Sequence, residues 1–187
     1  MRIIGGQVSG TNLVKFDGKR IRPTLDRVKE SLFNQIQPYL EGICFLDLFA
    51  GTGAIGLEAW SRGANSVILV ENDSQAFDLI CKNIEKCKVE KAAIVLRSDA
   101  FQALSDLEFN GAKCDLIYID PPFTLNLHDI CLERLSGSSI VKENSMIIVE
   151  HHHRTILRES YDKIFLSRQR KLGDTRLSFY GSCSLFS

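Results

Sequence analysis

Residues 45–56 read Phe45-Leu46-Asp47-Leu48-Phe49-Ala50-Gly51-Thr52-Gly53-Ala54-Ile55-Gly56, and this stretch decides the fold. Its first residues are apolar and typical of a buried strand, and its last residues begin a helix of small and apolar side chains. Between them, glycines let the backbone turn tightly and approach a ligand closely. The stretch therefore predicts a strand, a ligand-binding loop and a helix, in that order.

The same alternation of short apolar runs and longer amphipathic stretches continues after residue 56. It is typical of β-α-β units around a mainly parallel sheet. Strands are predicted at 43–48, 66–71, 93–97, 115–119 and 146–150, and helices at 54–62, 74–87, 100–107 and 126–136, with Ser74 and Asn126 as caps of the second and fourth helices. Runs near 161–168 and 175–185 predict a closing hairpin, turned at Leu172-Gly173-Asp174.

The first 42 residues do not follow this rhythm. Residues 1–21 contain several glycines and predict a short β-ribbon, and Thr24 is placed to cap an amphipathic helix that follows it. A segment of this size cannot bury a core of its own. We therefore expect a single domain over 1–187, in which residues 1–42 form an arm with a helix and residues 43–187 form the α/β core.

Composition indicates an ordinary globular chain. Of the 187 residues, 44% are hydrophobic and 25% are charged, and no apolar run approaches the roughly 20 residues that a membrane helix needs. The amino terminus lacks the apolar segment of a secretory signal, so we expect a cytoplasmic protein with no membrane partner. The six cysteines form no C-x-x-C pair, so neither a disulfide framework nor a zinc site is expected.

The net charge of zero conceals an uneven distribution. Residues 1–30 and 151–187 each carry seven basic and three acidic side chains, whereas residues 31–150 carry nine basic and 17 acidic ones. A polyanion would therefore meet the ends of the chain. Charge alone favours the simpler interpretation of two solvated charged faces, because seven basic residues in thirty is not extreme.

The glycine loop alone leaves two kinds of cofactor open. With Glu71 at the end of the next strand, the loop matches the fingerprint of nicotinamide dinucleotide enzymes. Asp47, however, would repel a pyrophosphate and attract a cationic group. Asp99, after the third strand, could accept a hydrogen bond from an adenine amino group, or simply cap a helix. Both carboxylates favour an adenosine-type cofactor with a positive centre.

A second motif, Asp120-Pro121-Pro122-Phe123, follows the apolar run 116–119. Asp120 and the carbonyl of Pro121 can accept the two N–H bonds of an aryl amine, which favours a pyramidal nitrogen. Phe123 can stack on the ring that carries the amine. Ligands of open α/β sheets bind at the carboxyl ends of the strands. The four residues therefore predict a binding site for a flat molecule that carries an amino group.

Three consecutive histidines, His151-His152-His153, suggest a metal. Neighbouring residues of an extended chain point to opposite faces, which leaves only His151 and His153 on one side. We therefore expect a surface or strand-end run that binds no metal.

Asp47, the loop Phe49-Ala50-Gly51-Thr52-Gly53, Glu71, Asp99 and the 120–123 motif resemble, in order and spacing, the Rossmann-like methyltransferases that use S-adenosylmethionine and act on exocyclic amines. The segments Met1-Arg2-Ile3-Ile4-Gly5-Gly6 and 22–34, RPTLDRVKESLFN, narrow this resemblance to the RsmD family. That family methylates guanine N2 in small-subunit (16S) ribosomal RNA. The loop and the 120–123 motif are shared by many methyltransferases, so the arm and its helix make the resemblance specific.

The resemblance implies a Rossmann-like fold with a mostly parallel seven-stranded sheet, a C-terminal antiparallel hairpin and a small N-terminal ribbon and helix arm. It implies S-adenosylmethionine as the cofactor and 16S ribosomal RNA as the partner, within a small ribosomal subunit or its precursor, for a chain that acts as a monomer. The implied cofactor-binding residues are Asp47, Phe49, Ala50, Gly51, Thr52, Gly53, Glu71, Asn72, Asp99, Ala100 and Asp120; the catalytic residues are Asp120, Pro121, Pro122 and Phe123. The basic side chains left in the arm as phosphate contacts are Lys15, Lys19, Arg20, Arg22, Arg27 and Lys29.

Three alternatives stay open from the sequence. The same cofactor could serve methylation of a DNA adenine or cytosine, or of a protein amide. The glycine loop with Glu71 could serve an NAD-dependent oxidoreductase. The basic arm could belong to an RNA-binding assembly factor without catalytic activity.

Overall fold

A computed structural model describes residues 1–15, 26–122 and 127–182, and the structural statements below concern these residues. The chain divides into two compact units, Met1–Ala100 (unit 1) and Phe101–Ser187 (unit 2). The division falls inside the predicted α/β core and not at residue 42, so the N-terminal arm belongs with the first half of that core. A single domain over 1–187 stays a prediction.

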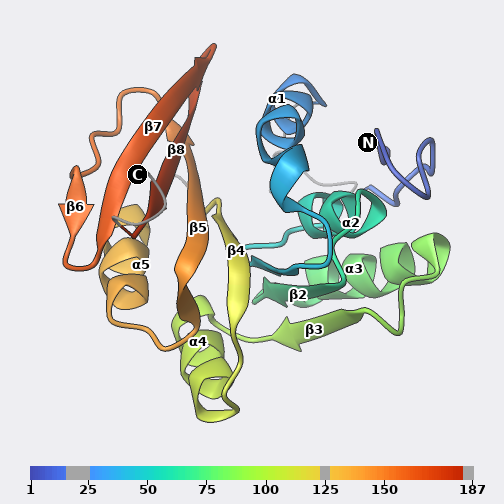
Figure 1. Cartoon of the computed structure of the whole chain (residues 1–187). Helices are drawn as coiled ribbons and strands as arrows, with labels where there is room; N and C mark the ends of the chain where they lie inside the picture. The colour runs from blue at the N-terminus through green and yellow to red at the C-terminus, as the bar shows by residue number, and fades with distance from the viewer. Residues whose placement is uncertain (16–25, 123–126, 183–187) are drawn as a thin grey trace. The chain divides into compact units, whose positions relative to one another are not determined.

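Unit 1 contains a parallel sheet in which β2 (Ser66–Glu71) pairs with both β1 (Cys44–Asp47) and β3 (Ala93–Arg97). Helix α2 (Ala54–Ser61) contacts β1 and β2, and α3 (Ser74–Cys87) contacts β2 and β3 (Figure 1). These bounds confirm the predicted strands and helices to within one residue. The cap of α3 was predicted wrongly, because Asp73 precedes the helix and its carboxylate accepts the N–H groups of Gln75 and Ala76, each at 2.9 Å.

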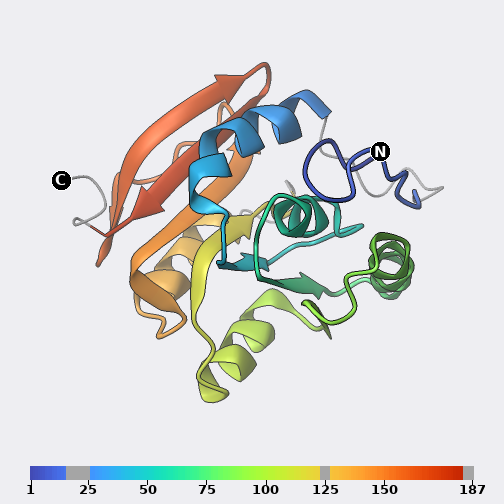
Figure 2. The same cartoon turned by 45° about the vertical axis from the view of Figure 1, so that its right-hand side comes forward.

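The arm of unit 1 consists of residues 1–15, helix α1 (Asp26–Ile36) and the short 3-10 helix η1 (Gln37–Tyr39). Within residues 1–15 the expected ribbon is reduced to one antiparallel bridge between Arg2 and Asn12. The N-terminal segment lies beside α2 in unit 1 (Figure 2). The predicted amphipathic helix is confirmed by α1, whose buried apolar side chains are Val28, Leu32, Phe33 and Ile36.

Unit 2 contains strands in the order β4-β5-β8-β7-β6. Strands β4 (Cys114–Ile119) and β5 (Val141–His152) are parallel, and the others pair antiparallel: β6 (Ser160–Tyr161), β7 (Ile164–Leu172) and β8 (Thr175–Gly181). The helices are α4 (Ala100–Phe109), which begins on the last residue of unit 1, and α5 (Leu127–Ser136).

The hairpin of β7 and β8 confirms the predicted closing hairpin, because Leu172 pairs with Thr175 around the predicted turn. Two features of unit 2 differ from prediction. Strand β5 begins five residues earlier than 146, at Val141, which pairs with Cys114 of β4. A register shift separates this pair from the pair of Leu116 with Met146. The two-residue strand β6 brings the described strands to eight where seven were expected. None of the helices in the described ranges has the length and apolar composition that spanning a bilayer requires.

Candidate active site

The loop after β1 in unit 1 is held in a tight turn. The N–H of Ala50 donates to the carbonyl of Val70 at 2.8 Å, which ties the loop to the end of β2. Gly51 has a φ of 56° and Gly53 a φ of 78°, values in the left-handed region that favours glycine, and Gly53 is the N-cap of α2. The sequence prediction of a glycine-dependent loop between a strand and a helix is therefore confirmed.

Glu71, the last residue of β2, bridges this loop to the start of α3. Its Oε2 accepts the N–H of Gly51 and its Oε1 accepts the N–H of Asp73, both at 2.8 Å. The side chain is half-buried, and burial raises the pKa of its carboxyl above the usual range, an effect that these N–H groups partly offset. A half-exposed carboxylate fixed from two sides can still accept hydrogen bonds from a pair of hydroxyl groups, as on a ribose.

Asp47, the last residue of β1, lies beneath the loop with 1% of its surface exposed. Its Oδ2 accepts the N–H of Gly56 at 3.3 Å, whereas its Oδ1 has no hydrogen-bond partner within the described ranges. Burial raises the pKa of Asp47 to about 7, and the N–H of Gly56 lowers it only in part. A buried carboxylate oxygen without a donor is costly, so this group is suited to a donor or a positive charge from a ligand.

Gly56 fixes how closely α2 approaches the sheet. A Cβ at this position would lie 2.2 Å from Cδ2 of Leu69 in β2 and 3.7 Å from Cβ of Asp47. A larger residue here would force the Cδ2 methyl of Leu69 to move, whereas glycine lets the N–H of residue 56 lie against the Asp47 carboxylate. The third glycine of the loop therefore has a packing role that also holds the site together.

The charges of the loop select between the two kinds of cofactor. A pyrophosphate binds to free N–H groups at a helix N-terminus. Here Glu71 takes the N–H of Gly51, Asp47 takes the N–H of Gly56, and both acceptors are carboxyl groups. Such a loop opposes a dianion and fits a cationic ligand with ribose hydroxyls, so the residues present fit S-adenosylmethionine better than a dinucleotide.

The remaining predicted cofactor residues of unit 1 lie in the same loops. Phe49 is partly exposed and Ala50 is buried, and the carbonyl of Thr52 accepts the side-chain N–H of Asn83 at 2.9 Å. Asn72 and Asp99 are exposed at the ends of β2 and β3. Ala100 is buried at the first position of α4.

Asp120 of unit 2 follows directly on β4, whose last four residues are buried. Asp120 is half-buried, Pro121 is buried and Pro122 is exposed. Phe123 lies outside the described residues. The strand thus ends in a partly accessible carboxylate on a backbone that two prolines restrict.

Unit 2 also holds a buried polar pair that the sequence analysis missed. Tyr118, two residues before Asp120, donates its hydroxyl to Glu150 of β5, and both side chains are buried. The pair ties the carboxyl ends of β4 and β5 together. Glu150 could have indicated this pair in the sequence, because it is an acidic residue at the end of an apolar strand.

The histidine run lies at the end of β5, as one of the two expected placements has it, but His151 is not on the surface. Its side chain is fully buried; Nδ1 donates to the carbonyl of His152 at 3.0 Å and Nε2 accepts from Oγ of Ser178 at 2.8 Å. Burial lowers the pKa of His151 to about 4. His128 of α5, whose ring lies 6.0 Å from that of His151, is also buried, and neither of its nitrogens has a partner in the described part of the chain. Burial lowers the pKa of His128 as well, so both rings are neutral at pH 7.

The predicted RNA contacts of the arm divide into three groups. Lys15 and Arg27 are exposed, as a phosphate contact requires. Lys29 is 1% exposed; its Nζ lies 3.1 Å from Oε2 of Glu58 and donates to the carbonyl of Arg2, so this burial corrects the expectation that it contacts RNA. The others lie outside the described residues: Lys19, Arg20 and Arg22.

Glu58, fully buried in α2, is the residue that organises the arm. Besides Lys29, it accepts the N–H groups of Ile4 and Gly5, each at 2.8 Å, and Nε of Arg62 at 2.7 Å. A buried carboxylate is stable only when it is paired and hydrogen-bonded in this way. The arm is therefore a fixed part of unit 1.

The chain is similar in sequence to known proteins. The model of the family described as "Conserved hypothetical protein 95" matches residues 1–181. A relative in Bacillus subtilis, "Putative rRNA methyltransferase YlbH", is 34% identical over 180 residues, which are 96% of this chain and 98% of the relative. "Ribosomal RNA small subunit methyltransferase D" of Haemophilus influenzae is 37% identical over 80% of this chain and 78% of its own length.

The fold has a close counterpart among solved structures. The structure of "Putative methyltransferase yhhF from Escherichia coli" superposes with a TM-score of 0.85 at 34% identity and covers 97% of each chain. The predicted Rossmann-like methyltransferase fold class is thereby confirmed.

Proposed function

Since the chain belongs to the family described as Conserved hypothetical protein 95, which is the RsmD family, we propose that it transfers a methyl group from S-adenosylmethionine to the exocyclic N2 of a guanine in 16S ribosomal RNA. The family supports methyl transfer to ribosomal RNA through the names of its relatives. The choice of guanine N2 rests on the resemblance to the RsmD family and on the predicted binding of an amino group by Asp120.

The observation that carries the proposal is the pair of carboxyl groups in the glycine loop. Asp47 and Glu71 occupy the N–H groups of Gly56 and Gly51 that a pyrophosphate would need. Among the residues that the structure describes, none donates a hydrogen bond to the buried Oδ1 of Asp47. Both features support a cationic adenosine cofactor over NAD, which makes an oxidoreductase the weaker alternative.

The residues of unit 1 would hold the cofactor, which supplies an electrophilic methyl group on a positively charged sulfur. Glu71 would accept the ribose hydroxyls and Asp99 the adenine amino group, while Asp47 offsets positive charge from beneath the loop. The other loop residues would shape the pocket through their backbone.

The residues of unit 2 would hold the amine. An aryl amine is a weak nucleophile because its lone pair is delocalised into the ring. Asp120 and the carbonyl of Pro121 would accept its two N–H bonds, which favours a pyramidal nitrogen and offsets the positive charge that develops on it. Pro122 would keep that carbonyl in place, and Phe123 would stack on the base. A base in structured RNA would first be splayed out, at a cost of a few kcal/mol.

We further propose that the chain works as a cytoplasmic monomer on a small ribosomal subunit or its precursor. Lys15 and Arg27 would contact phosphates through the exposed side of the arm, with Lys19, Arg20 and Arg22 as further contacts. These contacts would position the RNA without reading its sequence.

The proposal is tested by supplying labelled S-adenosylmethionine with small ribosomal subunits, protein-free 16S ribosomal RNA and DNA in parallel. Nucleosides from the labelled product are then separated by mass spectrometry. We expect label only in RNA, as N2-methylguanosine. Label only in DNA, or in a protein amide, would overturn the substrate. Binding of NAD without binding of S-adenosylmethionine in calorimetry would overturn the enzyme class. RNA binding without any methyl transfer would instead support an assembly factor.

A further inference from the structure

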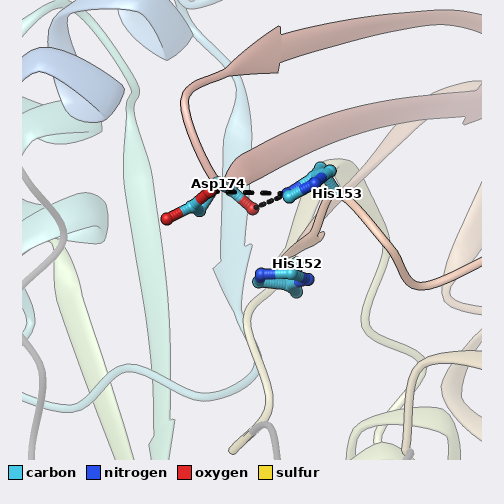
Figure 3. Close-up of side chains that lie close together, drawn as sticks. All are labelled: His152, His153 and Asp174. Carbon is cyan, nitrogen blue, oxygen red and sulfur yellow. Dashed lines mark hydrogen bonds and ion pairs between the residues drawn. The ribbon is translucent and has the colours of Figure 1, made fainter.

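Three potential metal ligands lie together at one end of the sheet of unit 2. They are His152, the last residue of β5, His153, which follows it, and Asp174, in the turn between β7 and β8 (Figure 3). One nitrogen of each ring and one carboxylate oxygen all lie within 4.8 Å of one another. The set differs from that considered in the sequence, where strand alternation placed His151 with His153.

The end of β5 explains the difference. The strand stops at His152, and residues 153 and 154 form a turn, so the alternation of side chains is lost. The rings of His152 and His153 lie 4.5 Å apart between centroids, with an interplanar angle of 37°. His151, by contrast, remains in the strand and points to its buried partner Ser178.

Backbone hydrogen bonds hold the two contributing segments in register. His152 pairs with Thr175 across β5 and β8, and the N–H of His153 donates to the carbonyl of Asp174 at 2.7 Å. The N–H of Thr155 donates to the carbonyl of His152 at 2.9 Å and closes the turn. The three side chains therefore start from backbone positions that the fold fixes.

We propose that His152, His153 and Asp174 bind a divalent transition-metal ion of the Zn²⁺ type. Two imidazoles and a carboxylate suit zinc and its neighbours in the first transition row, whereas Mg²⁺ and Ca²⁺ prefer oxygen ligands alone. Three protein ligands leave one tetrahedral position for water.

The ligand spacing is compatible with such an ion after a small contraction. Zinc–nitrogen and zinc–oxygen bonds of about 2.0–2.2 Å place neighbouring ligand atoms of a tetrahedron about 3.4 Å apart. The ligand atoms lie within 4.8 Å of one another, so any pair must draw together by about 1.4 Å at most. Asp174, with 79% of its side chain exposed, has room for this movement.

The existing contacts of the cluster show what the metal would replace and keep. Nδ1 of His153 lies 3.7 Å from Oδ1 of Asp174 and 3.2 Å from its carbonyl oxygen. Metal-bound histidines commonly donate their second ring N–H to such a carbonyl. Nδ1 of His152 accepts the N–H of Arg154 at 3.2 Å. A neutral imidazole has one in-plane lone pair, and this hydrogen bond uses it. A metal ion that binds the ring needs the same lone pair, so it would displace the hydrogen bond from Arg154.

The ion would join the end of β5 to the β7–β8 turn. It would bind the folded chain and not the unfolded one, because the ligands come from two segments about 20 residues apart in sequence. Occupation of the site should therefore raise the Tm of the chain. This inference does not depend on the proposed methyl transfer, because its measurements need neither cofactor nor RNA.

The experiment uses the full chain without a histidine tag, freed of metal with a chelator. Co²⁺ is titrated and followed by visible absorption, and Zn²⁺ is then added in competition. The ligand variants are His152→Gln, His153→Gln and Asp174→Asn. Asp162→Asn is the matched control, because Asp162 is an exposed aspartate in the preceding β6–β7 turn. Circular dichroism of each variant confirms that it is folded.

We expect one equivalent of Co²⁺, displaced by Zn²⁺, and a higher Tm with either ion. Each ligand variant should weaken binding by at least about tenfold and lose the gain in Tm, while Asp162→Asn should match the parent chain. No binding, unchanged affinity in folded Asp174→Asn or His153→Gln, or a thiolate-to-cobalt absorption band from one of the cysteines would each overturn the site.

Discussion

Two strand ends of this chain carry an aspartate in different ways. At the end of β1 in unit 1, Asp47 is buried beneath a loop of glycines, and the N–H of Gly56 contacts its carboxylate. At the end of β4 in unit 2, Asp120 is half-buried and is followed by two prolines. A buried carboxyl group can tune the charge of a permanent pocket, whereas an accessible one can contact a substrate that arrives and leaves. The following experiments test whether the two aspartates have these different roles.

The largest expected effect belongs to Asp120. Asp120→Asn should lower the rate of methyl transfer by about 10²–10⁴-fold, because the amide cannot offset the charge that develops on the amine. Binding of S-adenosylmethionine, measured by calorimetry, should change only a few-fold. Asp115→Asn is the matched control, since Asp115 lies at the other end of β4 and pairs with Lys142 on the surface. Equal rates for the two variants would remove Asp120 from the reaction.

The next effect concerns Lys29 in unit 1. Lys29→Met should lower the free energy of unfolding by about 3 kcal/mol, because it leaves the buried Glu58 with one cation fewer. Arg27→Met, two residues away and exposed, should change it by less than about 0.5 kcal/mol. Denaturant titration measures both. A larger loss from Arg27→Met would show that the arm is not held through Glu58.

A smaller effect is expected from glycine substitution. Gly56→Ala should cost about 1–3 kcal/mol of unfolding free energy, since its Cβ would lie 2.2 Å from Cδ2 of Leu69. In unit 2, a Cβ at Gly137 would meet no atom of the described residues within 4 Å, its chain neighbours aside, so Gly137→Ala should be nearly neutral. Gly56→Ala should also weaken cofactor binding in calorimetry, because the shift moves the loop. A neutral Gly56→Ala would show that the approach of α2 is not fixed by this glycine.

The smallest effect is the pH dependence set by Asp47. Its pKa of about 7 lies above the ordinary value of 3.8, so ionisation costs stability in the folded state. The unliganded chain should therefore lose stability as the pH rises between these two values. A cationic ligand favours the ionised form, so the affinity for S-adenosylmethionine should rise by up to about tenfold between about pH 6 and about pH 8.

S-Adenosylhomocysteine, whose sulfur is neutral, provides the control for this prediction, because its affinity should change less over the same range. Asp47→Asn should abolish the difference between the two ligands. Calorimetry at several pH values measures it. Parallel profiles for both ligands in the parent chain would contradict a role for Asp47 in charge recognition.

Much of the fold could be predicted because the β-α-β rhythm is strong. The range 66–71 was predicted as a strand and 74–87 as a helix, and both have these bounds in the structure. The cap of that helix was missed because Asp73 and Ser74 are both good capping residues in sequence, and only backbone geometry selects Asp73. The start of β5 was missed because the three residues after Val141 are polar and exposed.

The site was harder to predict where burial reverses the usual role of a residue. Lysine is normally exposed, so Lys29 was interpreted as a phosphate contact. The signal that could have corrected this was Glu58, the one charged residue of the mostly apolar helix α2, which required a cationic partner. The cluster of His152, His153 and Asp174 could not be predicted, because it depends on where β5 ends and on its pairing with β8.

The contact between the arm and Glu58 also sets an order of events during synthesis of the chain. Ile4 and Gly5 leave the ribosome first, but the carboxylate that accepts their N–H groups lies 54 and 53 residues later in the sequence. Translation proceeds at about 5–20 residues per second, so Glu58 is added roughly 3–10 s after Ile4 and Gly5. Ile4 and Gly5 can therefore reach their final place only after Glu58 of α2 has been made.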